Sequence, residues 1–279
     1  MSVFQAVIAQ ITDLHIKPQG ELVCGRVDSA AALTRCIKEL NRLSPRPDLV
    51  VISGDLVDAP SPQAYEHLMR LLKPLQIPFA AVPGNHDDRA MMRAALPDAR
   101  YAQSRGALNS MRSVGGVDIV LTDSAVPGAP HGELDAETLA WLDGTLGETA
   151  TRPALLFLHH PPFVTGIDHM DVQNLRNADK LAALVRRHPR VRLVAAGHLH
   201  RAIATTFAGI TATICPAPNH AVALDLEKRL PPSFTIEPPA FHLHVCLPGE
   251  GFGTIATHLV PTGDFGGPYP FFAADGRYL

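Results

Sequence analysis

Apolar residues gather in short runs that alternate with segments of helical periodicity along most of the chain. Short apolar runs closed by polar, Gly or Pro residues are typical of buried strands. They predict strands at 4–11, 49–52, 79–82, 154–158 and 191–195. Two weaker segments, 107–114 and 117–122, flank Gly115-Gly116, and this pattern predicts a hairpin.

The segments between these strands repeat their apolar residues every three or four positions, which predicts amphipathic helices. Helices are expected at 28–43, 61–72, 135–146 and 177–188. The second has a clear start signal, because Ser61 is a good N-cap and Pro62 suits the first helical position. Pro189 is expected to end the last helix.

Helical periodicity disappears after His200. Residues 203–260 form short β-type runs interrupted by proline, and the tail at 266–270 is irregular. No repeat and no Gly/Ser-rich linker divides the chain. We therefore expect a single α/β domain over residues 1–279, with a β-rich C-terminal part from about residue 203.

Composition and charge narrow the class of protein. Of the 279 residues, 46% are hydrophobic, which suits a large core, and no apolar run is long enough to span a membrane. The net charge of −3 argues against a nucleic-acid polymer as partner, because phosphate binding needs a concentrated positive field. The N-terminus lacks a basic signal-peptide region, and the four cysteines form no CxxC pair, so we expect a cytoplasmic protein with free thiols.

Five predicted strands end in a loop that opens with a side chain able to bind metal. Ligands collect at the carboxyl ends of strands in open α/β sheets, so these side chains are expected to converge. The seven candidate ligands are Asp13, His15, Asp55, Asn85, His159, His198 and His200. They offer oxygen and nitrogen but no thiolate, which suits Mn, Fe, Zn or Co. Seven ligands are too many for one tetrahedral ion and suit two ions that share a carboxylate.

Each of these motifs alone has an ordinary interpretation as a turn, and their joint occurrence in this order is what indicates a site. The series D-x-H, G-D-x-x-D, G-N-H-D, a lone His and G-H-x-H spans residues 13–200. On these motifs the chain resembles the calcineurin-like metallophosphoesterase superfamily. The resemblance implies a four-layer α/β/β/α sandwich with a binuclear metal site.

The resemblance also implies a role for each matching residue. The first ion would be held by Asp13, His15, Asp55 and His200. The second would be held by Asp55, Asn85, His159 and His198, so that Asp55 bridges the two ions. His86, from the G-N-H-D motif, would be the catalytic imidazole beside the leaving oxygen.

Three further features are similar to bacterial class III cyclic-nucleotide phosphodiesterases and glycerophosphodiesterases. They are the spacing from His159-His160-Pro161-Pro162 to G-H-x-H, the segment 25–28 and the pair Met170-Asp171. This similarity implies metal-dependent hydrolysis of a small phosphodiester, with 3′,5′-cyclic nucleotides first and glycerophosphodiesters second. A phosphomonoesterase or protein phosphatase remains an alternative, as does a non-catalytic interaction module, although the intact ligand set disfavours the latter. We expect a homo-oligomer and no membrane partner.

Other side chains are weaker candidates for the site. Arg26 could bind a phosphate oxygen or be a surface arginine, and His220 could line the pocket. Asp58 and Asp87 are expected to orient the ligands rather than bind metal. His160 follows a ligand in a segment expected to be extended, so its ring is expected to point away from the ligands and to pack or hydrogen-bond rather than bind metal.

Two clusters are expected to lie outside the site. His242 and His244 repeat the H-x-H pattern but do not follow a predicted strand end, so a solvated strand face is expected for them. Cations are favourable near a helix C-terminus. A solvated helix end is therefore expected for the basic residues Arg186, Arg187, Arg190 and Arg192.

Overall fold

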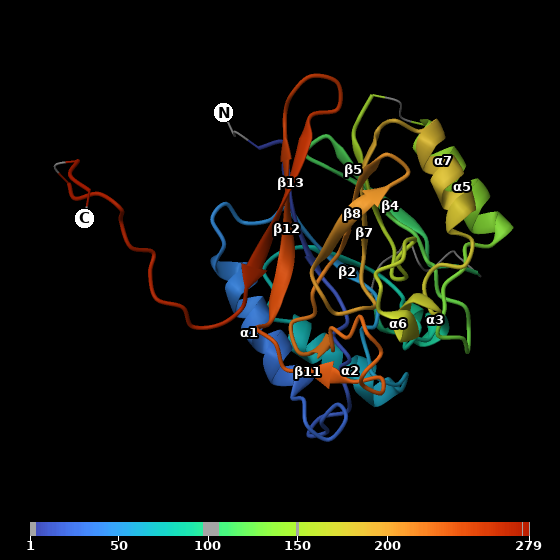
Figure 1. Cartoon of the computed structure of the whole chain (residues 1–279), viewed down its shortest axis with the longest axis horizontal. Helices are drawn as coiled ribbons and strands as arrows, with labels where there is room; N and C mark the ends of the chain where they lie inside the picture. The colour runs from blue at the N-terminus through green and yellow to red at the C-terminus, as the bar shows by residue number, and fades with distance from the viewer. Residues whose placement is uncertain (1–3, 97–105, 149–150, 275, 279) are drawn as a thin grey trace.

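The protein, seen here as a computed structural model, has four layers in the order α/β/β/α (Figure 1). The structure describes residues 4–96, 106–148, 151–274 and 276–278. Two β-sheets pack face to face, and helices cover the outer faces. This arrangement confirms the fold class expected from the sequence motifs.

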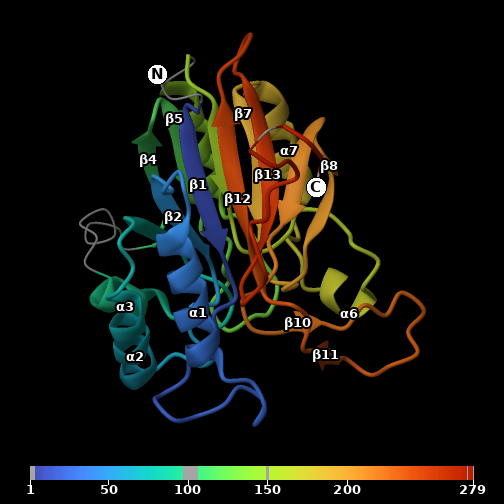
Figure 2. The same ribbon diagram turned by 90° about the vertical axis from the view of Figure 1, so that its left-hand side faces the viewer.

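The first sheet joins the N-terminal strands to the C-terminal ones. Its order is β13 (Thr254–Pro261), β12 (Ala240–Leu247), β1 (Ala6–Ile11), β2 (Leu49–Ser53) and β3 (Phe79–Val82). The last three are parallel, whereas β12 runs antiparallel to β1, with Ala6 opposite Cys246. Figure 2 shows β1 between β2 and β12. The β-rich C-terminal part therefore completes the sheet that begins the chain.

The second sheet has six strands and a parallel centre. Its order is β4 (Ser110–Val114), β5 (Val117–Leu121), β6 (Ala154–Phe157), β7 (Val191–Ala196), β9 (Ile210–Ile214) and β8 (Ile203–Phe207). The strands β5, β6, β7 and β9 are parallel, and β4 and β8 pair antiparallel at the edges. The expected hairpin turn at Gly115-Gly116 joins β4 to β5.

Because side chains alternate along a strand, each buried strand contributes to two core layers, one on each face of its sheet. In β2, Val50 and Ile52 pack toward the helices, whereas Leu49 and Val51 pack between the sheets. Successive side chains of a strand point to opposite faces, so a continuous apolar run fills two core layers at once. This is why these strands appear in the sequence as apolar runs without polar alternation.

The helices lie where the periodicity predicted them, with two short additions. They are α1 (Ser29–Arg42), α2 (Pro62–Leu72), α3 (Arg89–Ala95), α5 (Ala136–Glu148), α6 (Asp168–Asp171) and α7 (Ala178–Arg187). The first three pack on the first sheet, while α5 and α7 pack on the second. The Ser61 hydroxyl accepts a hydrogen bond from the Ala64 amide at 3.2 Å, which confirms the expected N-cap of α2. None of the described helices is long and apolar enough to cross a membrane.

The expectation for His242 and His244 is wrong. Both lie in β12, and His244 is fully buried between the sheets. Its Nδ1 lies 2.8 Å from the Thr257 hydroxyl, and its Nε2 lies 3.1 Å from Gln10 Oε1. Those partners satisfy the ring inside the protein, so β12 is a buried strand beside β1 rather than a solvated one.

The basic segment around α7 is solvated only in part. Arg187 lies at the surface beside Asp143, but Arg190 is 2% exposed. The Arg190 guanidinium donates to Asp118 Oδ2 at 2.8 Å and to backbone carbonyls around it. A buried arginine needs such a charged partner, and Asp118 in β5 supplies it across the sheet.

Candidate metal centre

The turns that follow the strands have an unusual backbone. Among the described residues, eight non-glycine residues have a positive φ. Five of these are candidate ligands, namely Asp13, His15, Asp55, His198 and His200. Left-handed backbone at such residues costs on the order of 1–3 kcal/mol each and persists only where surrounding contacts impose it. The strain is therefore concentrated at this edge of the two sheets.

Backbone and amide hydrogen bonds hold these turns in place. The pairing of β1 with β2 continues past the strands, because the Asp13 and His15 amides donate to the carbonyls of Gly54 and Asp55 at 3.0 Å. From the other side, the Asn219 side-chain amide donates to the Asp13 and Leu14 carbonyls at 2.9 and 3.0 Å. The D-x-H turn is fixed between these contacts.

One group of ligand atoms gathers around His15 and His200. Their Nε2 atoms are 3.2 Å apart. Asp13 Oδ1 lies 3.4 Å from Nε2 of His200, and Asp55 Oδ2 lies 3.5 Å from Nε2 of His15. All four side chains are buried. This group matches the set expected for the first ion.

A second group gathers around His159. Its Nε2 lies 3.2 Å from Asn85 Oδ1, 3.3 Å from His198 Nδ1 and 3.4 Å from Asp55 Oδ2. The same Asp55 oxygen thus faces imidazoles of both groups, while Asp55 Oδ1 accepts a hydrogen bond from the His86 amide at 2.9 Å. This group matches the set expected for the second ion.

The spacing of these atoms fits two bound cations. Ligands that lie about 2.0–2.2 Å from one ion are roughly 3–3.5 Å from each other, which is the separation found in both groups. Lone pairs brought this close without a cation or proton between them would repel. The donors are only oxygen and nitrogen, a chemistry that suits Mn, Fe, Zn or Co.

In several of these histidines, Nε2 faces the ligand group and a hydrogen bond to Nδ1 orients the ring. His159 Nδ1 lies 2.9 Å from the Ser53 carbonyl, and His200 Nδ1 lies 3.2 Å from the His220 carbonyl. A carbonyl can only accept, so Nδ1 of each ring carries a proton and Nε2 is the nitrogen left to bind a cation. His86 is held in the same way, with Nδ1 2.6 Å from the Asp58 carbonyl.

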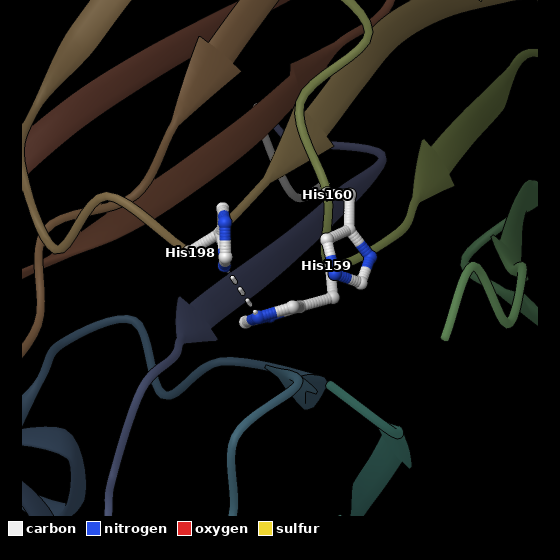
Figure 3. A group of neighbouring side chains, drawn as sticks. All are labelled: His159, His160 and His198. Carbon is white, nitrogen blue, oxygen red and sulfur yellow. Dashed lines mark hydrogen bonds between the residues drawn. The ribbon is translucent and has the colours of Figure 1, made fainter. Parts of the chain in front are cut away.

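His160 does not point away from the ligands as expected. Its ring centroid is 4.8 Å from that of His159 and 4.9 Å from that of His198, and Figure 3 shows the three rings together. The reason is that β6 ends at Phe157, so residues 159 and 160 form a bend and their side chains do not alternate. His160 Nδ1 lies 2.9 Å from the Ser124 hydroxyl, which anchors the ring to the loop after β5.

The charges of the site favour metal binding. Burial would raise the pKa of Asp55, but the adjacent His159, His15 and His86 hold that pKa well below its usual range. Burial lowers the pKa of His198 and of His200 well below the usual value, so both rings are neutral, which is the form that binds metal. In the metal-free chain, burial alone would lower the pKa of His159, but the charge and hydrogen bonding of Asp55, the charge of Asp13 and the Ser53 carbonyl together raise this pKa to about 9.

The remaining candidates differ in their distance from these groups. The His220 ring centroid is 4.5 Å from that of His200 and 5.8 Å from that of His15, so His220 lines the site. Asp58 Oδ1 lies 3.3 Å from His15 Nδ1. Arg26 is exposed in the turn closed by Val23 and Val27, and no described contact joins it to the other candidates.

Asp87 joins two of the motif turns. Its Oδ2 accepts hydrogen bonds from the Leu56 amide at 3.1 Å and the Gly84 amide at 2.9 Å, while its Oδ1 accepts from the Tyr65 hydroxyl at 2.9 Å. These bonds set the spacing between the G-D-x-x-D and G-N-H-D motifs. Burial and the charge of Asp55 raise the Asp87 pKa to about 6.

Sequence reasoning missed two residues that support the site, Asn219 and Gln10. Gln10 Nε2 donates to the Ser53 hydroxyl at 2.8 Å and to the Ala196 carbonyl at 3.0 Å, which links the two sheets directly behind the ligands. A glutamine inside an apolar strand was the available signal for Gln10, because a buried amide needs partners. Asn219 had only the weak signal of a polar residue between Pro218 and His220.

Comparison with known proteins gives one family and several relatives. The profile of the Calcineurin-like phosphoesterase family matches residues 6–202. A protein of Arcobacter nitrofigilis named "Probable glycerophosphodiester phosphodiesterase" is 35% identical over 98% of this chain and 99% of its own length. A "cAMP/cGMP dual specificity phosphodiesterase" of Mycobacterium tuberculosis is 36% identical over 76% of this chain and 67% of its own length.

A solved structure agrees with the fold. The crystal structure of a dimetal phosphatase from Danio rerio superposes with a TM-score of 0.66, covering 93% of this chain and all of that chain. Its sequence is 16% identical, so it supports the fold alone. The four-layer arrangement of the described residues is therefore shared with a known phosphatase fold.

Gly84→Ala should destabilise the fold, because the added methyl group would collide with Asp55. An added Cβ would overlap Asp55 Oδ1 and lie 2.5 Å from the Asp55 amide nitrogen. We expect the free energy of unfolding to fall by about 1–3 kcal/mol in denaturant titrations. The matched control is Gly144→Ala on α5, where nothing lies within 4 Å and a helical alanine should add about 0.5–1 kcal/mol. Equal stability of the two variants would contradict this account.

The metal-depleted protein should lose stability as the pH rises through about 9, because the folded-state pKa of His159 is about 9 against an ordinary value of 6.5. A raised folded-state pKa stabilises the fold fully below pH 6.5, and this stability is lost as the proton leaves. The free energy of unfolding should change with pH by at most about 1.4 kcal/mol per pH unit for one proton. Urea titrations of chelator-treated protein at several pH values measure it. His159→Gln should flatten the slope, and an unchanged slope would refute the pairing with Asp55.

Proposed function

Because the chain belongs to the calcineurin-like phosphoesterase family, we propose that it is a metal-dependent hydrolase of small phosphodiesters. The observation that carries this proposal is the position of Asp55. One of its carboxylate oxygens lies 3.5 Å from His15 Nε2 in one ligand group and 3.4 Å from His159 Nε2 in the other. A carboxylate placed between two nitrogen-rich groups is suited to bridge two cations.

In this proposal the two cations are held by the residues that the motifs indicated. One ion would be held by Asp13, His15, Asp55 and His200, and the other by Asp55, Asn85, His159 and His198. Iron, manganese, zinc or cobalt would suit these donors. Bound there, the cations would lower the pKa of a water molecule and neutralise charge on the phosphate oxygens.

His86 is proposed to protonate the leaving oxygen. Its Nδ1 is committed to the Asp58 carbonyl at 2.6 Å, so Nε2 is the atom left to exchange a proton with substrate. The His86 ring centroid is 4.8 Å from that of His15, which puts it beside the ligand groups, and its side chain is only partly buried. An alkoxide leaving group needs a proton as its P–O bond breaks, and an imidazole at this position can supply it.

The proposed substrate is a glycerophosphodiester, with 3′,5′-cyclic nucleotides as the second candidate, which reverses the order expected from the sequence motifs. The Arcobacter nitrofigilis relative supports the first, because the similarity covers 98% of this chain and so extends into the β-rich C-terminal part. The Mycobacterium tuberculosis relative, similar over 76% of this chain, supports the second. We further propose that residues 1–279 form one domain, since β12 completes the sheet that carries Asp13 and Asp55. A cytoplasmic location is proposed from the sequence, which lacks a basic signal-peptide region and a CxxC pair.

Turnover on a substrate panel tests this function. The protein is loaded with Mn²⁺, Fe²⁺, Zn²⁺ or Co²⁺ and assayed on glycerophosphocholine, cAMP, a bis-nitrophenyl diester and a nitrophenyl monophosphate. We expect hydrolysis of the diesters, with glycerophosphocholine preferred to cAMP, and loss of all turnover with a chelator. Preference for the monoester would show that the protein is a phosphomonoesterase instead.

Asp55→Asn should damage both metal sites, whereas Asn85→Ala should weaken mainly one. A bridging carboxylate neutralises charge on both ions, but a neutral amide oxygen binds one ion and contributes less. Metal analysis after dialysis should give about two ions per chain for the wild type, about one for Asn85→Ala and less than one for Asp55→Asn. Asp143→Asn is the matched control, because Asp143 lies on α5 and its described partners, Arg187 and His188, stand before β7 at the edge of the sheet opposite the ligands. Full metal content in Asp55→Asn would mean that Asp55 does not bridge.

His86→Ala should keep both metals and lose activity selectively. General acid catalysis contributes roughly 10²–10⁴-fold, so kcat on glycerophosphocholine should fall by that factor. A nitrophenolate leaves without a proton, so hydrolysis of the bis-nitrophenyl diester should fall much less. His169→Ala serves as the control, since His169 lies on α6 outside the ligand groups. Equal losses on the two substrates would assign His86 to phosphate positioning.

A further inference from the structure

An ordered flap lies beside the candidate metal centre. The flap, residues 223–237, follows the short strand β10 (Ala221–Val222) and includes β11 (Phe234–Thr235), which pairs with β10 antiparallel. The Ala223 amide donates to the Ser233 carbonyl at 2.8 Å, so the loop between the two strands is closed at its base. Figure 2 shows the flap beside α6, at the end of the sheets where β1 stops.

The flap is joined to the turn that carries the last two proposed ligands. Arg201, which follows the ligand His200, donates to a β10 carbonyl at 2.8 Å and to Glu237 Oε1 at 2.6 Å, so it holds both ends of the flap. In β11, the Phe234 ring contacts the ring of His220, and their centroids are 5.3 Å apart. Because His220 lines the candidate metal centre, the flap borders that centre on one side.

Large apolar side chains of the flap, and of the residues on either side of α6, are exposed. The flap and α6 touch, because a Cβ added at Gly166 would lie 3.3 Å from Leu226 Cδ2 and because Lys228 pairs with Asp168. Six apolar side chains here are between 58% and 79% exposed, namely Leu224, Leu226, Leu230, Ile236, Val164 and Val172.

The uncovered area of these six side chains is that of a functional surface. A buried Val, Leu or Ile side chain removes roughly 60–120 Å² from water, so six that are mostly exposed leave roughly 250–450 Å² uncovered. That is the size of the largest apolar patch on a typical monomer, and such patches are often functional. An apolar ligand would therefore find its contact area here.

The apolar surface rests on a small core that includes the ligand turn. Leu199, which separates two of the proposed ligands, is buried in one cluster with Ile167, Met170 and Val222. These residues come from the ligand turn, from the α6 region and from β10, so the exposed side chains are carried by elements packed directly on the site. A preformed surface loses little conformational entropy when it binds a ligand.

The charges of the flap favour a single amphiphilic molecule over a bilayer surface. In sequence the flap carries two cations and three carboxylates, so it lacks the cluster of basic residues that attracts an anionic lipid surface. Both cations are paired, Lys228 with Asp168 and Arg229 with Glu227. The apolar surface also borders the candidate metal centre, so a ligand with its phosphate at the proposed cations brings its own apolar part onto the flap.

We infer that this apolar surface is a subsite for the acyl chain of a lysophospholipid, a glycerophosphodiester that carries one chain. The inference rests on the proposed function and names the substrate within the proposed class. A lysophospholipid combines a phosphodiester, which suits the cations, with a chain that the exposed leucines can remove from water. Glycerophosphocholine has no apolar part to cover them. Hydrolysis adds water across one ester P–O bond and yields an alcohol and a phosphate monoester.

A chain-length series of lysophosphatidylcholines tests this inference. The hexanoyl, octanoyl and decanoyl forms are assayed as monomers, beside glycerophosphocholine, on the metal-loaded protein. Each methylene that enters the subsite should raise kcat/KM by up to about fourfold. The triple variant Leu224→Ser, Leu226→Ser and Leu230→Ser should flatten this dependence. The control Leu259→Ser changes a leucine of β13 that is 53% exposed, and it should keep the dependence. No dependence in the wild type, or the same dependence in the triple variant, overturns the inference.

Equilibrium dialysis measures binding apart from turnover. The zinc-loaded His86→Ala variant is used, so that hydrolysis does not consume the probe. Decanoyl lysophosphatidylcholine, kept below its micelle concentration, should bind at least about 10-fold more tightly than the hexanoyl form. The triple leucine change, added to His86→Ala, should remove this difference. Binding to phosphatidylcholine vesicles without binding to the monomeric probe would mean a membrane-docking surface, and it overturns the inference.

The two assays separate failure of this inference from failure of the proposed function. Turnover of glycerophosphocholine without any effect of chain length overturns the acyl subsite and leaves the proposed activity standing. Chain-dependent binding without turnover of any diester contradicts the proposed activity and leaves the subsite standing.

Discussion

The carboxylate of Asp55 is the interaction on which the rest of the site depends. It is 2% exposed, and burial of a carboxylate is costly unless positive charge compensates it. His15 and His159 approach it from two different ligand groups, and the His86 amide binds its second oxygen. No side chain fits at Gly84, because a Cβ there would collide with this carboxylate. The positive φ of Asp55 and of its neighbours in space is the conformational cost of bringing so many ligands to one point.

The fold could be predicted from the sequence because its strands are buried on both faces. Apolar runs such as 49–52 have no polar alternation, and short runs of this kind are typical of strands between two covered layers. The start of α2 could be predicted equally well, because the N-cap role of Ser61 and the helix-starting role of Pro62 depend only on neighbouring residues. The ligand residues could be predicted because of the topology of the sheets. Each directly follows an apolar strand, and parallel strands bring their carboxyl ends to one edge.

The parts that the sequence did not predict depend on partners far away in the chain. His244 was expected to be solvated, and only its pairing with Gln10 and Thr257 makes burial of the ring possible. His160 was expected to point away from the ligands, but the bend after β6 turns its ring toward His198. Asn219 holds the Asp13 turn across more than two hundred residues of sequence. No local pattern encodes contacts of this range.

The pairing of β1 with β12 has a consequence for synthesis of the protein on the ribosome. The strand that ends in Asp13 has β2 on one side, but its other edge stays open until residues 240–247 have been translated. Until then, Ala6 to Gln10 offer unpaired backbone groups to any neighbouring nascent chain. Contacts of such sequence separation also form slowly. Among the described strands, β1 is thus the first to be translated and among the last to gain both of its neighbours.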